Sequence, residues 1–326
     1  MSELFIKQEV VRVLPHLDAI LLDVDGVILD VAQTFRVVAS HVTQWHAVNV
    51  MHLQDTGTLF TPEECELFKN AGGFNNDWDL TNAVVALVVA KHAQSGAKDT
   101  NTLREQAPDW HEYTSELKRR GGGLVVAEKY ILDFLDSHQR RDFARAWNPA
   151  LVTRLFQEMY AGEKDCHHLY GFKPEHILGE GYLEKETVIM DAALLPLKIK
   201  TGVLTGRIAA ETRIALQRAG LSERIPETHW VTESDGVRKP DGRALGLLQE
   251  KMKFKLGVYV GDTIDDLRVV QNFRETNAMG RARVLSCLVL SGPAGGANRR
   301  AFLEAGAEIV APDVNAVLNY LGSVLK

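Results

Sequence analysis

The chain has 326 residues, of which 45% are hydrophobic and 25% are charged, as is usual for a folded globular protein of one large domain or two. Its net charge of −6 argues against a nucleic-acid partner held by electrostatic attraction, and no apolar run approaches the roughly 18 residues of a membrane span. The N-terminal residues mix charged and apolar side chains, unlike a secretory signal, and the three cysteines are widely separated. These features predict a cytoplasmic protein with no membrane segment.

The first predicted strand is the apolar run at residues 19–22, within the segment AILLDVDGVILD. It ends in two acids, Asp23 and Asp25, followed by Gly26. Two carboxylates at the end of a buried strand should repel each other and resist the loss of water. The chain must therefore supply a cation or another partner that offsets this cost.

Residues 34–189 read as a mostly helical insertion. Amphipathic or buried helices are predicted at 34–48, 81–94, 127–138 and 148–160. The stretch from 95 to 123 is polar and rich in glycine at its end, which predicts a surface loop with at most one short helix.

After residue 190 the pattern changes to short apolar runs that alternate with helical segments. Strands are predicted at 199–207, 228–235, 255–262, 282–292 and 308–312, and helices at 208–219, 242–252, 266–274, 298–307 and 314–325. Such alternation predicts a parallel sheet with helices on both faces. The run at 19–22 is the additional strand that would join this sheet.

Ligands of open α/β sheets bind at the carboxyl ends of the strands, and these positions carry polar residues here. Asp23 and Asp25 follow the first strand, Thr205 and Gly206 follow the second, and Asp262 follows a later one. Lys239 lies in a predicted turn, between Gly206 and Asp262 in the sequence.

This set of residues suits phosphoryl chemistry on Mg²⁺, a hard cation that prefers oxygen ligands. Asp23 and Asp262 are the expected ligands, together with a backbone carbonyl near Asp25. A carboxylate can also attack phosphorus, while a second acid protonates the leaving oxygen and later activates water. Thr205 and nearby backbone N–H groups, such as that of Gly206, can hold phosphate oxygens, and Lys239 can neutralise their charge.

The segments DVDGVILD, VLTGR, RKPDG and GDTIDD resemble, in this order, four motifs of the haloacid dehalogenase (HAD) superfamily. The match is to the phosphatase-type branch with a helical cap after the first core strand (subfamily I, phosphoglycolate-phosphatase-like). The ending AGAEIVAPDVNAVLNYL is similar to the family's last strand and helix. The resemblance implies a Rossmann-like, doubly wound α/β core at residues 1–33 and 190–326, with a mostly α-helical cap at 34–189.

The resemblance also implies a role for each motif residue: Asp23 as nucleophile, Asp25 as general acid/base, Thr205 and Lys239 as phosphate binders, Asp262 as a Mg²⁺ ligand and Asp266 as an outer-shell or alternative ligand. Asp25 separates this sequence from dehalogenating, phosphonate-cleaving and ATPase members, which carry other residues there. It therefore favours hydrolysis or transfer of a phosphate ester. Asp265 is an extra acid to which no role is assigned.

The expected activity is Mg²⁺-dependent hydrolysis of a small soluble phosphomonoester through an aspartyl-phosphate. The long insertion between the first and second motifs favours a closed site for small substrates over protein substrates. A phosphomutase on the same core is the nearest alternative, and a non-catalytic binding or regulatory protein with the same fold is the other. Within the insertion, GGFNNDWD offers Asn75, Asn76 and Asp77 as candidate readers of the leaving group, or as ordinary caps of an interhelical loop.

Overall fold

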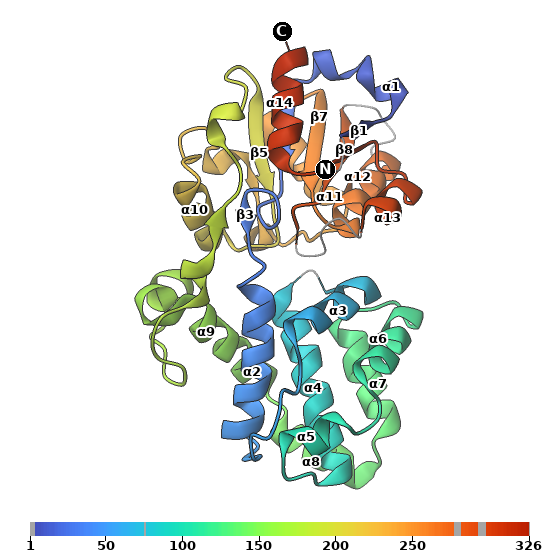
Figure 1. Ribbon diagram of the computed structural model, residues 1–326, viewed down its shortest axis with the longest axis vertical. Helices are drawn as coiled ribbons and strands as arrows, with labels where there is room; N and C mark the ends of the chain where they lie inside the picture. Colours follow the sequence, from blue (N-terminus) through green and yellow to red (C-terminus); the bar gives the residue numbers. More distant parts are fainter. Residues whose placement is uncertain (1–3, 75, 277–281, 293–297, 326) are drawn as a thin grey trace. The chain divides into compact units, whose positions relative to one another are not determined.

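The computed structural model describes residues 4–74, 76–276, 282–292 and 298–325 (Figure 1). The chain divides into two compact units, Met1–Ala32 with Glu186–Lys326, and Gln33–Lys185. We call them the core unit and the helical unit. Among the described residues, no helix is both long and apolar enough to cross a membrane.

The core unit is built on a seven-stranded sheet of order β1-β9-β8-β7-β2-β5-β6. All neighbouring strands run parallel except β1, which pairs with β9 in the antiparallel direction. The strands are β1 (Phe5–Ile6), β2 (Ala19–Leu22), β5 (Lys200–Leu204), β6 (Trp230–Val231), β7 (Leu256–Gly261), β8 (Arg283–Val289) and β9 (Ile309–Ala311). The predicted Rossmann-like parallel sheet is confirmed, and the first predicted strand, β2, lies inside it between β7 and β5.

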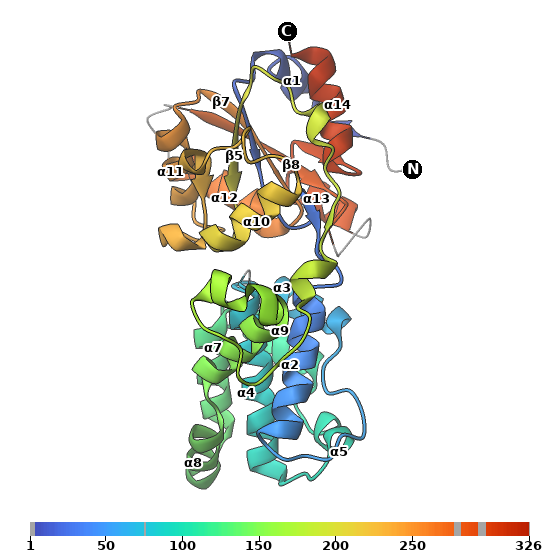
Figure 2. The same cartoon turned by 90° about the vertical axis from the view of Figure 1, so that its left-hand side faces the viewer.

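Helices cover both faces of this sheet, as the alternating pattern predicts. α11 and α12 lie on one face, where their apolar side chains join Leu21, Leu204 and Tyr259 in a buried cluster. α14 lies on the other face (Figure 2). The helices of the core unit are α1 (Gln8–Val11), α10 (Ala209–Arg218), α11 (Arg243–Met252), α12 (Ile264–Thr276), α13 (Arg299–Glu304) and α14 (Val314–Val324), with single 3₁₀ turns η1 (Leu14–His16), η4 (Ala192–Leu194), η5 (Glu227–His229) and η6 (Glu233–Asp235).

The helical unit is organised around α4, which is buried on all sides from Leu80 to Lys91. A helix that is apolar around its whole circumference must lie inside a bundle, and α4 contacts α2, α5, α7, α8 and α9. The helices are α2 (Phe35–Asn49), α3 (Cys65–Ala71), α4 (Asp77–Ser95), α5 (Thr100–Arg104), α6 (Trp110–Arg119), α7 (Leu124–Phe134), α8 (Ser137–Ala146) and α9 (Pro149–Tyr170), with 3₁₀ turns η2 (Pro62–Glu64) and η3 (Tyr182–Lys185).

Two predictions for the helical unit are wrong. The stretch from 95 to 123 contains two helices, α5 and α6, instead of a loop with at most one. α6 begins at a capping box between Asp109 and Glu112 and buries Trp110, Tyr113 and Leu117 on one face, a readable helical signal. The helix predicted at 127–138 is the end of α7 and the start of α8, which Asp136 caps.

A second, two-stranded sheet lies where the chain leaves the core unit and returns to it. β3 (Leu29–Asp30) pairs antiparallel with β4 (Thr187–Val188). No pattern in the sequence indicates this pairing, because its partners are two-residue strands at opposite ends of the insertion. It keeps the two connecting segments adjacent to each other in the core unit.

His46 makes the stability of the helical unit sensitive to acid. It is fully buried on α2, and neither ring nitrogen has a hydrogen-bond partner among the described residues. Burial lowers its pKa to about 4, whereas an unfolded histidine titrates near 6.5. Between these values the unfolded chain binds a proton that the folded chain does not, so stability falls as pH falls.

We expect about 2 kcal/mol of unfolding free energy to be lost through His46 between pH 7 and pH 5. Chemical denaturation at both pH values should show this loss reduced in His46→Leu relative to the parent. The exposed His111 provides the control, since His111→Leu should keep the parental pH dependence. An unchanged pH dependence in His46→Leu would contradict the prediction.

Candidate active site

The carboxyl ends of three adjacent strands bring the predicted motif residues together. β2 lies between β5 and β7, and Leu22 pairs with Val203 on one side and Val260 on the other. Asp23 follows β2 directly, and its backbone N–H donates to the carbonyl of Val260 at 2.9 Å. The register therefore sets Asp23 beside the residues that follow both neighbouring strands.

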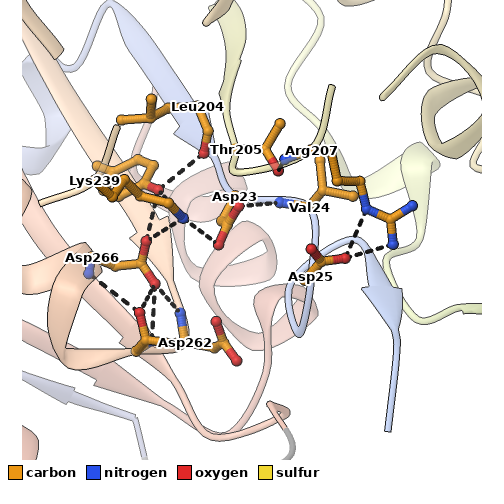
Figure 3. Close-up of polar contacts among 11 residues, drawn as sticks. Asp23, Val24, Asp25, Leu204, Thr205, Arg207, Lys239, Asp262 and Asp266 are labelled. Carbon is orange, nitrogen blue, oxygen red and sulfur yellow. Dashed lines mark hydrogen bonds and ion pairs between the residues drawn. The ribbon is translucent and has the colours of Figure 1, made fainter. Parts of the chain in front are cut away.

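Lys239 links two of the predicted acids. Its Nζ donates to Oδ2 of Asp23 at 2.7 Å and to Oδ1 of Asp266 at 2.7 Å (Figure 3). All three side chains are almost completely buried. The other carboxylate oxygen of Asp23, Oδ1, accepts the backbone N–H of Val24 at 2.7 Å. The contacts on its two oxygens fix the orientation of the Asp23 carboxylate.

Asp266 has hydrogen-bond donors on both oxygens. Oδ1 accepts from Lys239 and from the hydroxyl of Tyr259 at 2.9 Å. Oδ2 accepts from the backbone N–H groups of Asp262 at 3.1 Å and Thr263 at 2.9 Å, and from the Thr263 hydroxyl at 2.6 Å. With its acceptor positions used in this way, Asp266 is suited to orienting Lys239 and the start of α12 more than to direct binding of a cation.

The Asp262 carboxylate contrasts with that of Asp266. Among the described residues, no hydrogen bond or ion pair reaches it, although the residue is only 9% exposed. Gly26 and Gly292 lie close to this carboxylate. A Cβ atom would come within 2.3 Å of its Oδ2 at Gly26 and within 2.0 Å at Gly292. A buried carboxylate without a donor is costly unless a cation or proton joins it.

The pKa values of the cluster follow from burial and from an excess of negative charge. Burial raises the pKa of Asp23 to about 7, with Lys239 opposing the shift and Asp266 adding to it. Burial, Asp266 and Asp23 together raise the pKa of Asp262 well above its usual range. Although burial opposes its charge, the neighbouring acids raise the pKa of Lys239 well above the usual value for lysine. Lys239 in turn lowers the pKa of Asp266 against the effect of burial.

These residues fit a divalent cation. One oxygen each of Asp23, Asp262 and Asp266 lies within 4.8 Å of the others, and Lys239 contacts two of these acids, Asp23 and Asp266. Three carboxylates and one lysine in a buried site have an excess of negative charge. A hard cation with oxygen ligands would neutralise this excess. Asp23 and Asp262 have the oxygens best suited to bind it.

Asp25 belongs to a second, adjoining cluster that sequence reasoning missed. Its Oδ1 accepts two N–H groups of Arg207, at 2.9 Å from Nε and 2.6 Å from Nη2 (Figure 3). The same guanidinium donates to both oxygens of Glu186, at 3.2 Å and 2.7 Å. Arg207 lies in the segment VLTGR, but the family resemblance implies no role for it. Glu186 lies outside every motif and within the range predicted as cap, whereas the structure includes it in the core unit.

Thr205 and Gly206 occupy the loop after β5. Thr205 is buried, and its hydroxyl accepts the backbone N–H of Arg207 at 3.3 Å. Gly206 is exposed, with open space where a side chain would extend. This loop therefore combines a hydroxyl with an accessible backbone, the donors expected for phosphate oxygens.

The candidate specificity residues lie in the helical unit, at the start of α4. Asn75 lies outside the described residues. Asn76 caps α4, with its Oδ1 accepting the backbone N–H of Trp78 at 2.8 Å. Asp77 forms an ion pair with Lys69 at 2.9 Å. The capping alternative for Asn76 thus has a clear structural basis, and a contact with substrate stays a prediction.

Two substitutions of Asn76 separate capping from substrate contact. Asn76→Ala should lower stability by about 1 kcal/mol because the cap is lost, whereas Asn76→Asp should keep the cap. If the carboxamide also reads the leaving group, both variants should raise KM for the true substrate. A KM unchanged in Asn76→Asp would contradict the specificity role, with thermal unfolding reporting the cap separately.

Comparisons with known proteins bear on the fold. No protein-family model matches the chain, and no curated protein is significantly similar to it in sequence. A structure solved by the Northeast Structural Genomics Consortium aligns over 94% of this chain and 99% of its own, with a TM-score of 0.64 and 17% identity. Phosphatase Tt82 from Thermococcus thioreducens aligns over 93% and 98%, with a TM-score of 0.59 and 24% identity.

A HAD hydrolase of family IA, variant 3, from Entamoeba histolytica aligns over 94% of this chain and 99% of its own, at a TM-score of 0.47 and 12% identity. At these identities, likeness in structure speaks for the fold. The described architecture agrees with the motif order, because the strand that leads into DVDG lies between β7 and β5 and the helical unit is inserted after it. The chain therefore has a Rossmann-like α/β core with an inserted helical unit, a fold that it shares with the structures that align at TM-scores of 0.64 and 0.59.

Proposed function

We propose that this protein is a Mg²⁺-dependent phosphatase of the HAD type that hydrolyses a small phosphomonoester through an aspartyl-phosphate on Asp23. The observation that carries the proposal is the Asp23 carboxylate. It is buried at the end of the interior strand β2, accepts a hydrogen bond from Lys239 at 2.7 Å, and lies close to two further acids. A buried cluster with this excess of negative charge suits a divalent cation better than a purely structural ion pair, and a bound cation would in turn attract a phosphate.

In the proposed reaction, an oxygen of Asp23 attacks phosphorus and the bond from phosphorus to the ester oxygen breaks. Asp25 gives a proton to that departing oxygen. Asp25 then takes a proton from water, which attacks the aspartyl-phosphate and releases inorganic phosphate. Thr205 and the backbone at Gly206 hold phosphate oxygens, and Lys239 offsets their charge.

Asp23, Asp262 and the backbone carbonyl of Asp25 would hold Mg²⁺. Asp266 would orient the site indirectly, through its hydrogen bonds with Lys239 and Thr263. Bound there, the cation would neutralise charge on the phosphate and on the cluster. This arrangement gives a cation partner to the Asp262 carboxylate, which no described residue contacts by a hydrogen bond or ion pair. It also offsets the repulsion expected between Asp23 and Asp25.

The substrate class and location are part of the same proposal. A small soluble ester is favoured by the long helical insertion, which is typical of sites that exclude water. Phosphatase Tt82 carries the activity in its name, which agrees with the proposed reaction. A cytoplasmic location is supported by Cys65, Cys166 and Cys287, which are all buried and unpaired.

A panel of phosphorylated metabolites tests the proposed function. We expect release of inorganic phosphate from at least one ester in the presence of Mg²⁺, and loss of turnover in EDTA. Product analysis separates the alternatives, because a phosphomutase would return an isomeric phosphate ester. No Mg²⁺-dependent turnover of any ester would overturn the proposal in favour of a binding protein.

Gly292→Ala tests the cation site without removing a carboxylate. The new methyl group would meet Oδ2 of Asp262 at 2.0 Å, so the carboxylate must move. We expect the Mg²⁺ concentration for half-maximal activity to rise about tenfold or more, as when the support of a metal ligand is lost. Gly246→Ala is the control, since its Cβ would meet nothing within 4 Å. An unchanged Mg²⁺ requirement in Gly292→Ala would contradict the assignment of Asp262.

A further inference from the structure

The guanidinium of Arg207 is enclosed by two carboxylates. Its side chain is 1% exposed and that of Glu186 is fully buried, whereas that of Asp25 is 30% exposed. Glu186 binds it in a fork through both oxygens, at 2.7 Å and 3.2 Å. Planar, two-point contact of this kind fixes the orientation of an arginine.

Each member comes from a segment that is itself anchored in the core unit. Arg207 follows β5, and its backbone carbonyl accepts the N–H of Glu233 at 2.9 Å. Asp25 lies in the turn between β2 and β3, and Glu186 directly precedes β4. Since β3 and β4 pair with each other, the segments that carry the two acids are tied together beside Arg207.

Both contacts from Arg207 fall on one oxygen of Asp25. Nε and Nη2 donate to Oδ1, and no described residue forms a hydrogen bond or ion pair with Oδ2. A guanidinium only donates hydrogen bonds, so a proton carried by Asp25 in this arrangement lies on Oδ2. In this partly exposed side chain, Oδ2 is therefore the oxygen left to exchange a proton with substrate or water.

We infer that Arg207, anchored by Glu186, is a positioning residue that holds Asp25 by Oδ1 and presents Oδ2 to the leaving-group oxygen. The inference rests on the proposed phosphatase function and adds two residues to it. Neither touches substrate, and each acts through Asp25. The arrangement also offsets the charge of Asp25 beside Asp23 without using Lys239.

The dependence of the rate on the leaving group tests this role. Phenyl phosphate and p-nitrophenyl phosphate have nearly the same shape, but nitrophenoxide leaves readily without a proton and phenoxide does not. kcat/KM reports the steps up to formation of the aspartyl-phosphate, where Asp25 protonates the leaving oxygen. Asp25→Asn should therefore lower kcat/KM for phenyl phosphate far more than for p-nitrophenyl phosphate, by about 10²-fold or more for the former.

Arg207→Lys and Glu186→Gln should reproduce this selective loss in weaker form. Lysine cannot bridge two carboxylates as a fork, and glutamine removes the charge that anchors Arg207. We expect kcat/KM for phenyl phosphate to fall about tenfold and that for p-nitrophenyl phosphate to change less than about threefold. In the Asp25→Asn background, adding Arg207→Lys should change the rate less than about twofold, because residues that act through one group are not additive.

Glu308→Gln is the matched control for Glu186→Gln. Glu308 is a buried acid of the core unit that pairs with Arg274, outside the site. It should lower both substrates' rates equally or not at all.

Three results would overturn the inference. They are an equal loss with both esters in Arg207→Lys and Glu186→Gln, no loss in either variant, or a further large loss in the double variant. If the parent chain turned over no ester with Mg²⁺, the proposed function would fail and the inference with it. Turnover by the parent with the wrong pattern in the variants would overturn the positioning role alone.

Discussion

Asp23→Asn is expected to abolish turnover, with kcat lower by at least about 10⁴-fold, while the protein stays folded. A carboxamide cannot form the aspartyl-phosphate, so the loss does not depend on the substrate. Stability should hold or rise, because burial already disfavours the charged carboxylate and raises its pKa to about 7. Mass spectrometry of acid-quenched parent enzyme should find phosphate on the peptide that contains Asp23, and none in the variant.

The neighbouring acid Asp265 supplies the control for Asp23. It lies in the segment GDTIDD and contacts Arg268 at 3.1 Å, apart from the three clustered carboxylates. Asp265→Asn should keep turnover within about threefold of the parent, in the range of changes that touch no reacting group. Substantial hydrolysis by Asp23→Asn, with its fold intact by circular dichroism, would remove Asp23 as the nucleophile.

Lys239→Met is expected to cause the largest loss of stability among the site variants, about 3–5 kcal/mol in EDTA. The change leaves the buried carboxylates of Asp23 and Asp266 without their shared cation, which lies 2.7 Å from each. Turnover should fall about 10²–10³-fold as well, because a charge aimed at the phosphate is lost. Chemical denaturation in EDTA measures the first effect and steady-state kinetics the second.

Two further variants sharpen the Lys239 prediction. Adding Asp23→Asn to Lys239→Met removes one unpaired charge, so the double variant should be more stable than Lys239→Met alone. Lys251 pairs with Asp235 at 2.8 Å on a partly exposed surface, and Lys251→Met should cost no more than about 1 kcal/mol. A Lys239→Met protein as stable as Lys251→Met would show that the buried pairing contributes little.

Much of the core could be predicted from the sequence because its signals are local. The apolar runs that become β2, β5, β7 and β8 are bounded by turns, and polar residues follow the first three directly. In a parallel sheet those ends must meet at one edge, which brings Asp23 beside Asp262 and Lys239 without knowledge of the full topology. The pairing of Asp23 with Lys239 follows the same logic.

The features that escaped prediction depend on contacts between distant segments. Nothing near Glu186 in the sequence indicates that its side chain contacts Arg207. The predicted end of the insertion, at residue 189, also includes Glu186 in the cap, whereas the structure includes it in the core unit. Gly292 is one glycine among 26, and its closeness to Asp262 is visible only in three dimensions. Asn76 could be read as a cap or a ligand, and the backbone N–H groups it accepts show that it caps α4.

The pairing of β3 with β4 has a consequence for how this chain folds. Ala19 lies opposite Lys200 in the parallel register of β2 and β5, so the whole helical unit belongs to the stretch of chain that connects two neighbouring strands. Closing a disordered loop costs free energy that rises by about 0.6 kcal/mol for each doubling of its length. Once the insertion has folded and β3 has paired with β4, most residues between the two strands are already ordered. They then add little to the entropic cost of closing the loop. The central strand pair can then form at the entropic cost of a short connection, as it would in a chain that had no insertion.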